Sequence, residues 1–376
     1  MPSFSPRPAA QGFFLRTGRV AVGLGVLLLM AGPASAQESG PRFRADVETV
    51  LVNVLVTDRQ GQPISGLEKE NFQLFEDGVE QEILNFFPVD APFSVALLLD
   101  TSYSTVGKLG RIQNAAIAFR QQIHPDDEVM VISFDDQVYL DTDFTRNSDE
   151  VERAIKTTRT GGSTQLYEAV FIGMERLQEQ PFRKILVLFT DGIDSASLET
   201  SEAETLAYSK EADATIYTMF FDTETEALAR AGSPPSFPGP AGTPGTIPGR
   251  NPGPLGNPAP SPFPMPLPTP PPQRRQPGEV GRDESEREQI RATYREAKYY
   301  LGELAKATGG TSFDTARNLT DLDAAFAKIA EEMRSLYSIA YVSSNPEKDD
   351  RFREIKITVD RPEGRIRARR GYYSRD

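Results

Sequence analysis

Three short stretches concentrate hydroxyl and carboxylate side chains where buried strands are expected to end or helices to begin. Asp100-Thr101-Ser102-Tyr103-Ser104 and Thr190-Asp191-Gly192 each follow an apolar run, and Gly161-Gly162-Ser163-Thr164 precedes an amphipathic segment. Such oxygen donors, without imidazole or thiolate companions, suit Mg²⁺, Mn²⁺ or Ca²⁺ and not zinc. Because open α/β sheets bind ligands at the carboxyl ends of their strands, the pattern predicts one cation site shared by three loops.

Other uses of these residues remain open at this point. The hydroxyls could merely cap helices and turns. An aspartyl-phosphate hydrolase would need a second Asp two residues after Asp100, where Ser102 stands. A Ser–His–Asp hydrolase would have to use His124, which falls in a turn expected at the opposite edge of the sheet. Since the chain has neither a Gly-x-Ser-x-Gly elbow nor a phosphate-binding loop, we predict that it is not an enzyme. Asp194 could support the cation site from behind or cap a turn.

The elements expected to position these loops alternate between strand and helix. Four nearly continuous apolar runs, at 95–99, 129–134, 185–189 and 216–220, are typical of strands buried on both faces. Apolar residues recur at helical spacing between or after them, at Ile112, Ala116, Phe119 and Ile123, at Leu166, Val170, Gly173 and Leu177, and at Leu322, Phe326, Ile329 and Met333. The alternation predicts a doubly wound, mostly parallel sheet covered on both faces.

The segments on either side of this α/β region show the residue alternation typical of antiparallel strands instead. Val50, Val52, Val54 and Val56 alternate with other residues at period two, and Glu76-Asp77-Gly78 is a hairpin signal. The same alternation returns at 353–359. We therefore expect residues 42–92 and 336–376 to pair into one small β-sandwich, with residues 93–335 inserted between them.

The C-terminal segment is also rich in cations. Residues 351–376 carry nine Arg and Lys against four acidic residues. Arg365, Arg367, Arg369 and Arg370 could bind a polyanion, but their alternation with Ile366 and Ala368 is described more simply as the wet face of a strand.

A proline-rich block interrupts the α/β region. Residues 231–280 hold 18 of the 30 Pro and 8 of the 29 Gly. Proline neither donates to a ladder nor continues a helix, so this block is expected to be an extended or disordered insert.

Composition excludes several function classes. The chain has 376 residues, 54 Asp and Glu against 41 Lys and Arg, a net charge of −13, one His and no Cys. Disulfides, thiolate nucleophiles and multi-His metal sites are therefore excluded. The acidic balance argues against nucleic-acid binding.

The N-terminus predicts export. Three Arg precede the apolar run from Val20 to Met30, which is too short for the roughly 20 residues that span a bilayer. Ala34-Ser35-Ala36 supplies small residues for cleavage after Ala36, so residues 1–36 are expected to be a signal peptide. Removing them takes three Arg and no acidic residue, and the charge from −13 to −16. No later stretch could span a membrane, and we expect a periplasmic or secreted protein.

The cation-site residues carry a family resemblance. Asp100, Ser102, Ser104, Thr164 and Asp191 match in order the metal-ion-dependent adhesion site (MIDAS) of the von Willebrand factor A domain, and the sequence resembles that domain over about residues 93–335. More narrowly, it resembles bacterial exported proteins of the acidobacterial VWFA-related type. The resemblance implies a Mg²⁺ ion held directly by the two Ser and, on ligand binding, by the Thr, with the two Asp acting largely through waters.

Together these observations predict an exported, non-enzymatic adhesion protein. Its divalent cation, Mg²⁺ or alternatively Mn²⁺ or Ca²⁺, would capture a carboxylate of a protein partner. The alternative is a scaffold that assembles an envelope complex, in which the metal is mainly structural.

Overall fold

The computed structural model describes residues 49–87, 91–181, 183–231, 277–315, 320–361 and 364–374. The expected signal peptide (1–36) and nearly all of the proline-rich insert lie outside these residues. The chain divides into two units, residues 1–221 with 297–376, and residues 222–296. Within the described ranges, no helix combines the length and apolar composition that crossing a membrane requires.

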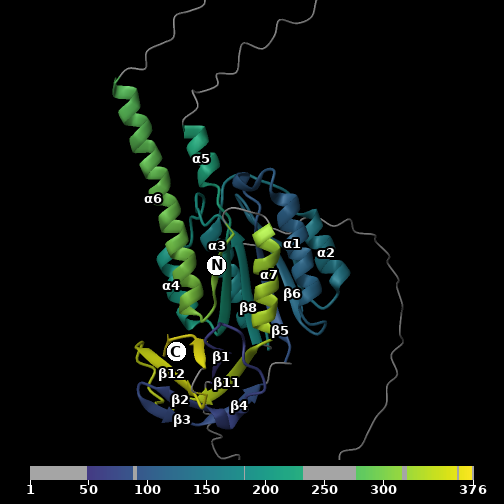
Figure 1. The fold of residues 1–376 in the computed structure, drawn as a ribbon, viewed down its shortest axis with the longest axis vertical. Coiled ribbons are helices and arrows are strands. Elements are labelled where there is room, and N and C mark those ends of the chain that lie inside the picture. The colour runs from purple at the N-terminus through teal and green to yellow at the C-terminus, as the bar shows by residue number, and fades with distance from the viewer. Residues whose placement is uncertain are drawn as a thin grey trace, which may run out of the picture. The chain divides into compact units, whose positions relative to one another are not determined.

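A six-stranded sheet forms the centre of the larger unit, in the order β10-β9-β8-β5-β6-β7 (Figure 1). All neighbouring pairs are parallel except β6 and β7. The strands are β5 (Phe93–Asp100), β6 (Glu128–Phe134), β7 (Val138–Thr145), β8 (Arg183–Thr190), β9 (Ala214–Phe220) and β10 (Ser312–Asp314). Every residue of β5, β8 and β9 is buried, which explains their unbroken apolar runs. The predicted doubly wound sheet is confirmed, with an antiparallel edge strand.

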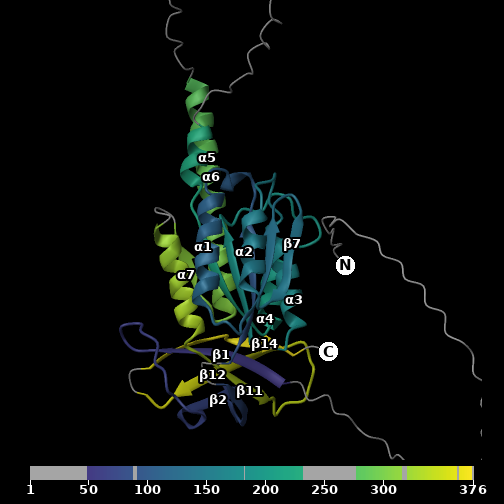
Figure 2. The same ribbon diagram turned by 90° about the vertical axis from the view of Figure 1, so that its right-hand side faces the viewer.

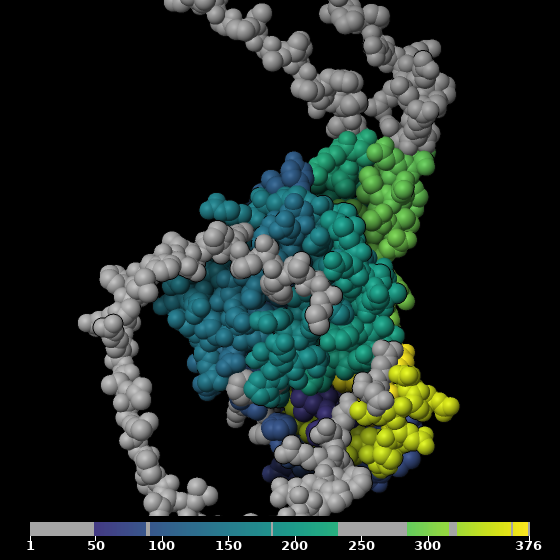
Figure 3. Space-filling model, turned by 180° about the vertical axis from the view of Figure 1, so that it is seen from behind, coloured from purple at the N-terminus to yellow at the C-terminus, as the bar shows by residue number. Residues whose placement is uncertain are grey.

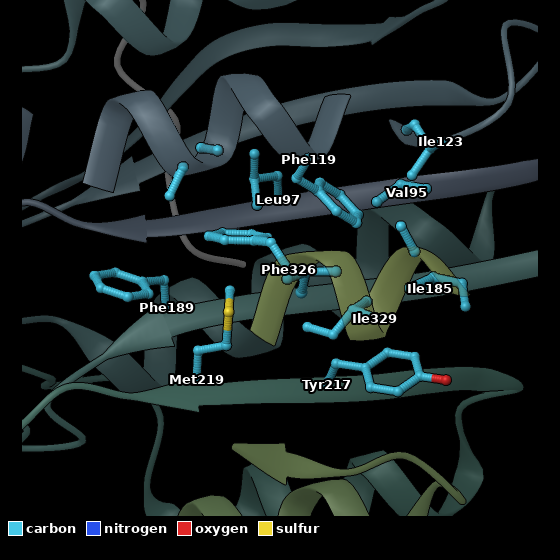
Figure 4. Packing of buried hydrophobic residues seen from close by; sticks show 14 of the residues in the cluster. Val95, Leu97, Phe119, Ile123, Ile185, Phe189, Tyr217, Met219, Phe326 and Ile329 are labelled. Carbon is cyan, nitrogen blue, oxygen red and sulfur yellow. The ribbon is translucent and has the colours of Figure 1, made fainter. Parts of the chain in front are cut away.

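Helices cover both faces of this sheet. Buried residues of α1 (Leu109–Gln122), α2 (Ser148–Thr157) and α7 (Thr320–Met333) pack on one face, and Phe119 contacts Phe326 with ring centroids 5.3 Å apart (Figure 4). On the other face, α3 (Leu166–Gln178) lies so close to the sheet that a Cβ on Gly173 would stand 3.1 Å from Leu98. The spacing of apolar residues therefore predicted α1, α3 and α7 correctly.

Two further helices complete the second face of the sheet. They are α4 (Glu202–Glu211) and the end of α6 (Pro277–Ala307). Tyr300 of α6 shares a 3.0 Å hydrogen bond with Thr205 of α4, and the backbone oxygen of Leu301 accepts from the Thr218 hydroxyl of β9 at 3.2 Å. The smaller unit contains α5 (Glu224–Ala231) and the first part of α6, and within it the Thr223 and Tyr294 hydroxyls are hydrogen-bonded.

The two ends of the chain form a pair of four-stranded antiparallel sheets (Figure 2). One has the order β13-β1-β11-β4 and the other β14-β12-β2-β3. Strands from the two ends pair directly, since β1 lies between β11 and β13 and β2 pairs with β12; Figure 3 shows the two segments side by side in purple and yellow. The strands are β1 (Thr49–Thr57), β2 (Phe72–Glu76), β3 (Val79–Gln81), β4 (Ile83–Phe87), β11 (Leu336–Val342), β12 (Phe352–Val359), β13 (Arg365–Ala368) and β14 (Gly371–Tyr373).

A buried ion pair lies inside this β-sandwich. Arg353 donates to Glu76 at 3.3 Å, and both side chains are only 2% exposed. The Tyr341 and Tyr372 hydroxyls donate to the same carboxylate at 2.7 and 3.0 Å. Burial alone would raise the pKa of Glu76, but the hydrogen bonds from Ser343, Tyr341, Tyr372 and Arg353 outweigh it and the pKa is lowered. The ion pair is thus held charged by its neighbours.

The C-terminal arginines are not simply the wet face of a strand, and that interpretation was wrong for two of the four. Ile366 and Ala368 pack on the sandwich core, so β13 turns its arginines to the other side. There Arg367 is paired with Glu332 of α7. Arg369 is buried and donates to the backbone oxygens of Ala212 and Lys210. These two arginines contact elements that belong to the α/β region, whereas Arg365 and Arg370 are exposed.

Candidate metal centre

The three predicted loops lie at the carboxyl edge of the central sheet. Asp100 and Thr190 are the last residues of β5 and β8, two neighbouring parallel strands. The glycine loop is fastened to the first of these loops, because Gly161 N donates to Thr101 O and Tyr103 N donates to Gly162 O, both at 2.8 Å. The folding of separate strands thus brings Asp100, Ser102, Ser104, Thr164 and Asp191 to one edge.

Two buried carboxylates at this edge, those of Asp100 and Asp191, repel each other electrostatically. Asp100 is fully buried and Asp191 is 2% exposed. Burial, and secondly the charge of Asp191, raise the pKa of Asp100 to about 7, although hydrogen bonds from Ser102 and Thr190 oppose the rise. Asp100 forms no ion pair with any residue the structure describes. A cation at this place would relieve both causes of the raised pKa.

The hydroxyls lie beside these carboxylates. Ser102 and Ser104 have their Oγ atoms 3.0 Å apart, and the backbone N–H of Ser102 donates to Asp100 at 2.9 Å. Tyr103–Thr105 forms a short 3₁₀ helix, η2, in which Ser104 is included. This local turn places alternate residues of the motif on one side, as the Asp-x-Ser-x-Ser spacing requires.

Thr164 is held by the loop that follows β8. It is 6% exposed, and its backbone N–H donates to the Ser195 hydroxyl at 2.9 Å. Its backbone oxygen accepts from the N–H groups of Ser195 and Ala196, both at 3.0 Å. The backbone of Thr164 is therefore fixed on both sides.

Asp194 serves as a remote helix cap. Its Oδ1 accepts from the backbone N–H of Leu166 at 2.8 Å, at the first residue of α3. The same oxygen accepts from the Ser197 hydroxyl at 2.6 Å. A carboxylate at a helix N-terminus satisfies free N–H groups and interacts favourably with the helix dipole. Two roles were considered for Asp194, support of the cation site and capping, and this geometry is that of a cap.

Two positioning residues were missed by the sequence analysis. The Thr190 hydroxyl donates to Asp100 at 2.6 Å and accepts from Gly192 N at 3.0 Å, so it ties the first and third loops together. Ser195 holds the Thr164 loop. Thr190 could have been found, because it directly precedes Asp191 at the end of an apolar run; Ser195 carried no signal.

A fourth acidic side chain lies close to the glycine loop. Asp135 directly follows β6, and a Cβ on Gly161 would stand 1.8 Å from its Oδ2. Only glycine therefore fits at 161. Burial, and secondly the neighbouring Asp136, raise the pKa of Asp135 to about 6. Asp135 is a suitable comparison for the candidate ligands because it is a buried carboxylate at the same edge.

The donor set fits a hard divalent cation. It consists of two carboxylates and three hydroxyls, and in the described part of the chain no three or more His, Cys, Asp or Glu side chains converge to hold a metal. Hydroxyl and carboxylate oxygens are ligands of Mg²⁺, Mn²⁺ and Ca²⁺. His124 is elsewhere: it lies in the turn between α1 and β6, its side chain is 53% exposed, and it contacts Asp126.

Residues 95–193 match the family described as the von Willebrand factor type A domain. No curated protein matches the chain.

One similar solved structure is that of the conserved hypothetical protein BatB from Bacteroides thetaiotaomicron. It is 12% identical with a TM-score of 0.39, and the match covers 64% of this chain and 98% of the BatB chain. An aerotolerance-related membrane protein from Bacteroides fragilis is 13% identical with a TM-score of 0.38 and the same coverage. The SpRpn10 VWA domain is 14% identical, with a TM-score of 0.30, and covers 35% of this chain and 75% of its own.

The match includes Asp100, the glycine loop and Asp191 on the strand–helix framework described above. Domains of this family are protein-interaction modules. The narrower resemblance to exported VWFA-related proteins stays a prediction. The chain therefore contains a von Willebrand factor type A (VWA) domain, matched over residues 95–193.

Proposed function

We propose that this protein is an exported adhesion protein whose VWA domain binds a divalent cation and, through it, a carboxylate of a protein partner. The observation that supports this most is the juxtaposition of two buried carboxylates, with the pKa of Asp100 raised to about 7, beside a pair of serine hydroxyls. Asp100, Ser102, Ser104, Thr164 and Asp191 are the proposed ligands. Bound there, the cation would supply an electropositive centre that attracts an acidic group.

The residues around the centre have separable tasks. Thr190 holds Asp100 by its hydroxyl, at 2.6 Å, so that the carboxylate stays aimed at the edge of the sheet. Asp194 and Ser195 hold the Thr164 loop against the start of α3. None of them supplies an acid, a base or a nucleophile with a partner suited to catalysis, which supports binding as the function.

Exposed apolar side chains on the same loops suggest what surrounds the acidic group of the partner. Tyr103 and Val106, next to the serines, are 61% and 52% exposed, and Leu198, on the loop after β8, is 90% exposed. Exposed apolar residues gathered at a functional edge are typical of protein-interaction surfaces. We propose a carboxylate flanked by apolar residues, and export by the signal at residues 1–36.

Calorimetric titration of the mature protein with Mg²⁺ and Mn²⁺ tests the centre. Asp100→Asn and Ser102→Ala should abolish binding while the circular dichroism spectrum stays unchanged. Asp135→Asn is the matched control, because it neutralises another buried carboxylate at the same edge and should leave binding intact. Binding that survives Asp100→Asn and Ser102→Ala would refute the proposed centre.

A second experiment separates adhesion from the structural alternative. Partners captured by the immobilised protein in Mg²⁺ should be released by EDTA, while the protein stays folded by circular dichroism and its melting temperature falls only slightly. Leu198→Ser should weaken capture without changing Mg²⁺ affinity. A large fall in melting temperature on chelation, with the partner still bound, would instead favour a structural metal in an assembly scaffold.

A further inference from the structure

A cationic cavity of about 370 Å³ lies between the end of α6 and strands β12 and β13. Five cationic residues line it, and none of its lining residues is acidic. They are Lys306, Lys356, Arg367, Arg369 and Arg370. This local positive charge is opposite in sign to the net charge of the chain, −13. The cavity shares no residue with the candidate metal centre.

Two of the five charges are already neutralised by carboxylates. Lys306 contacts Glu303 at 2.9 Å, one turn earlier on α6. Arg367 is paired with Glu332. Both pairs fix cationic side chains in place, but neither adds much net positive charge to the cavity.

The other three cations lack a carboxylate partner among the described residues. Lys356 and Arg370 are exposed and form no ion pair there. Arg369 is 7% exposed, and its guanidinium donates only to backbone oxygens, including those of Ala212 at 3.2 Å and Gly371 at 3.2 Å. Burial lowers its pKa. The charge of Asp213 opposes this effect. Because the hydrogen-bond acceptors of Arg369 are all neutral, a further anion close by would still stabilise its buried guanidinium.

The shape of the cavity indicates the size and polarity of its ligand. Ile355, Ile357 and Ile366, which also face the sandwich core, contribute an apolar wall. A volume of about 370 Å³ lies within the range of small-ligand sites and exceeds what a bare phosphate ion fills. An anionic head among the cations and an apolar part against the isoleucines would satisfy both.

We propose that this cavity binds a phosphate ester. Arginine and lysine are the side chains that bind phosphate oxygens most strongly, and arginine does so through its planar fork of donors. The phosphate would contact the exposed side chains of Lys356 and Arg370, with the buried Arg369 adding positive potential. The same chemistry is offered by a free phosphate ester and by a phospholipid headgroup.

Calorimetry in EDTA at low ionic strength tests the proposal on the mature protein. The probes are inorganic phosphate, glycerol 3-phosphate and dihexanoyl phosphatidic acid below its micelle concentration. We expect saturable binding of at least one ester, and at least tenfold weaker binding by Lys356→Gln/Arg370→Gln. Preference for the lipid would indicate a headgroup site, and equal binding of glycerol 3-phosphate a site for free esters.

The control is Arg361→Gln/Arg365→Gln, which also removes two exposed positive charges of the same segment but lies outside the cavity. It should bind like the wild type. Equal weakening of both double variants would show that only the overall charge matters and would overturn the site, as would the absence of saturable binding with every probe. If the double cavity variant loses its circular dichroism spectrum, Arg370→Gln alone takes its place. Because EDTA is present throughout, the result is independent of the proposed metal centre.

Discussion

Replacing Asp191 by Asn should stabilise the metal-free protein while abolishing its stabilisation by Mg²⁺. The amide keeps the shape of the side chain and the oxygen that accepts from Ile193 N at 3.2 Å, but removes the charge that helps to raise the pKa of Asp100. Two opposite effects from one isosteric change are expected only if the two carboxylates are close and together bind the cation.

The magnitude follows from the pKa of Asp100. A rise from 3.8 to about 7 corresponds to about 4 kcal/mol of unfavourable free energy in the ionised folded state. Burial is the larger cause and Asp191 the second, so removing the second charge should recover about 1 kcal/mol. For a chain of this size that is a rise of about 2 °C in melting temperature.

The effect should depend on pH in a definite direction. The folded pKa of Asp100 is raised, so between about pH 4 and 7 the unfolded chain has released a proton that the folded chain still holds. The stability of the metal-free wild type therefore falls as pH rises through this window. The gain from Asp191→Asn should be large at pH 8 and nearly absent at pH 5, where Asp100 is protonated.

The assay is thermal unfolding in EDTA at pH 5 and pH 8, repeated at pH 8 with Mg²⁺. Mg²⁺ should raise the melting temperature of the wild type and leave that of Asp191→Asn unchanged. Asp194→Ala is the control: it removes the cap of α3, and should lower the melting temperature at both pH values by an amount equivalent to about 1 kcal/mol. A melting temperature that does not rise at pH 8 in EDTA, or an intact response to Mg²⁺, would refute the reasoning.

Three further predictions concern the framework. Glu76→Gln leaves Arg353 with an uncompensated buried charge and should lower the free energy of unfolding in urea by about 3–5 kcal/mol; a loss below about 1 kcal/mol would contradict a buried pair. Phe326→Ala opens a cavity against Phe119 and should cost about 3–5 kcal/mol by the same measurement, unless the helices collapse into the space. Asn147→Ala removes the oxygen that caps α2 and should cost about 1 kcal/mol, whereas Asn147→Asp should cost little in thermal unfolding.

Much of the α/β region could be predicted because its signals are local. Strands buried on both faces need apolar residues throughout, and helices with one buried face need them every three or four residues. The edge strands β7 and β10 were missed because they lack such a local apolar pattern. β7 is only half-buried along most of its length, so it carries no apolar run, and β10 has three residues.

The candidate site was partly predictable. Asp100 ends one strand, Asp191 directly follows another, and Thr164 lies two residues before a helix; the topology of a parallel sheet brings such ends together. Thr190 hydrogen-bonds Asp100 on the neighbouring strand. This role depends on the side-chain rotamer of Thr190 and on a residue 90 positions away in the sequence, so no local pattern indicates it. The helix cap supplied by Asp194 spans 28 positions, beyond the range of any local capping rule.

Residue chemistry and hydrophobic period are local properties. They were therefore enough to predict the candidate donors of the metal centre, the strand and helix pattern, and the antiparallel strands on either side of the α/β region. What the C-terminal arginines contact depends instead on how distant segments pack together. Alternation along β13 requires Arg367 to point away from Ile366 and Ala368, and Arg369 directly follows this strand. It does not say whether water or protein lies on that side. The fold places Glu332 and the backbone of Ala212 there, and this turns an apparent wet strand face into part of an interface and a cationic cavity.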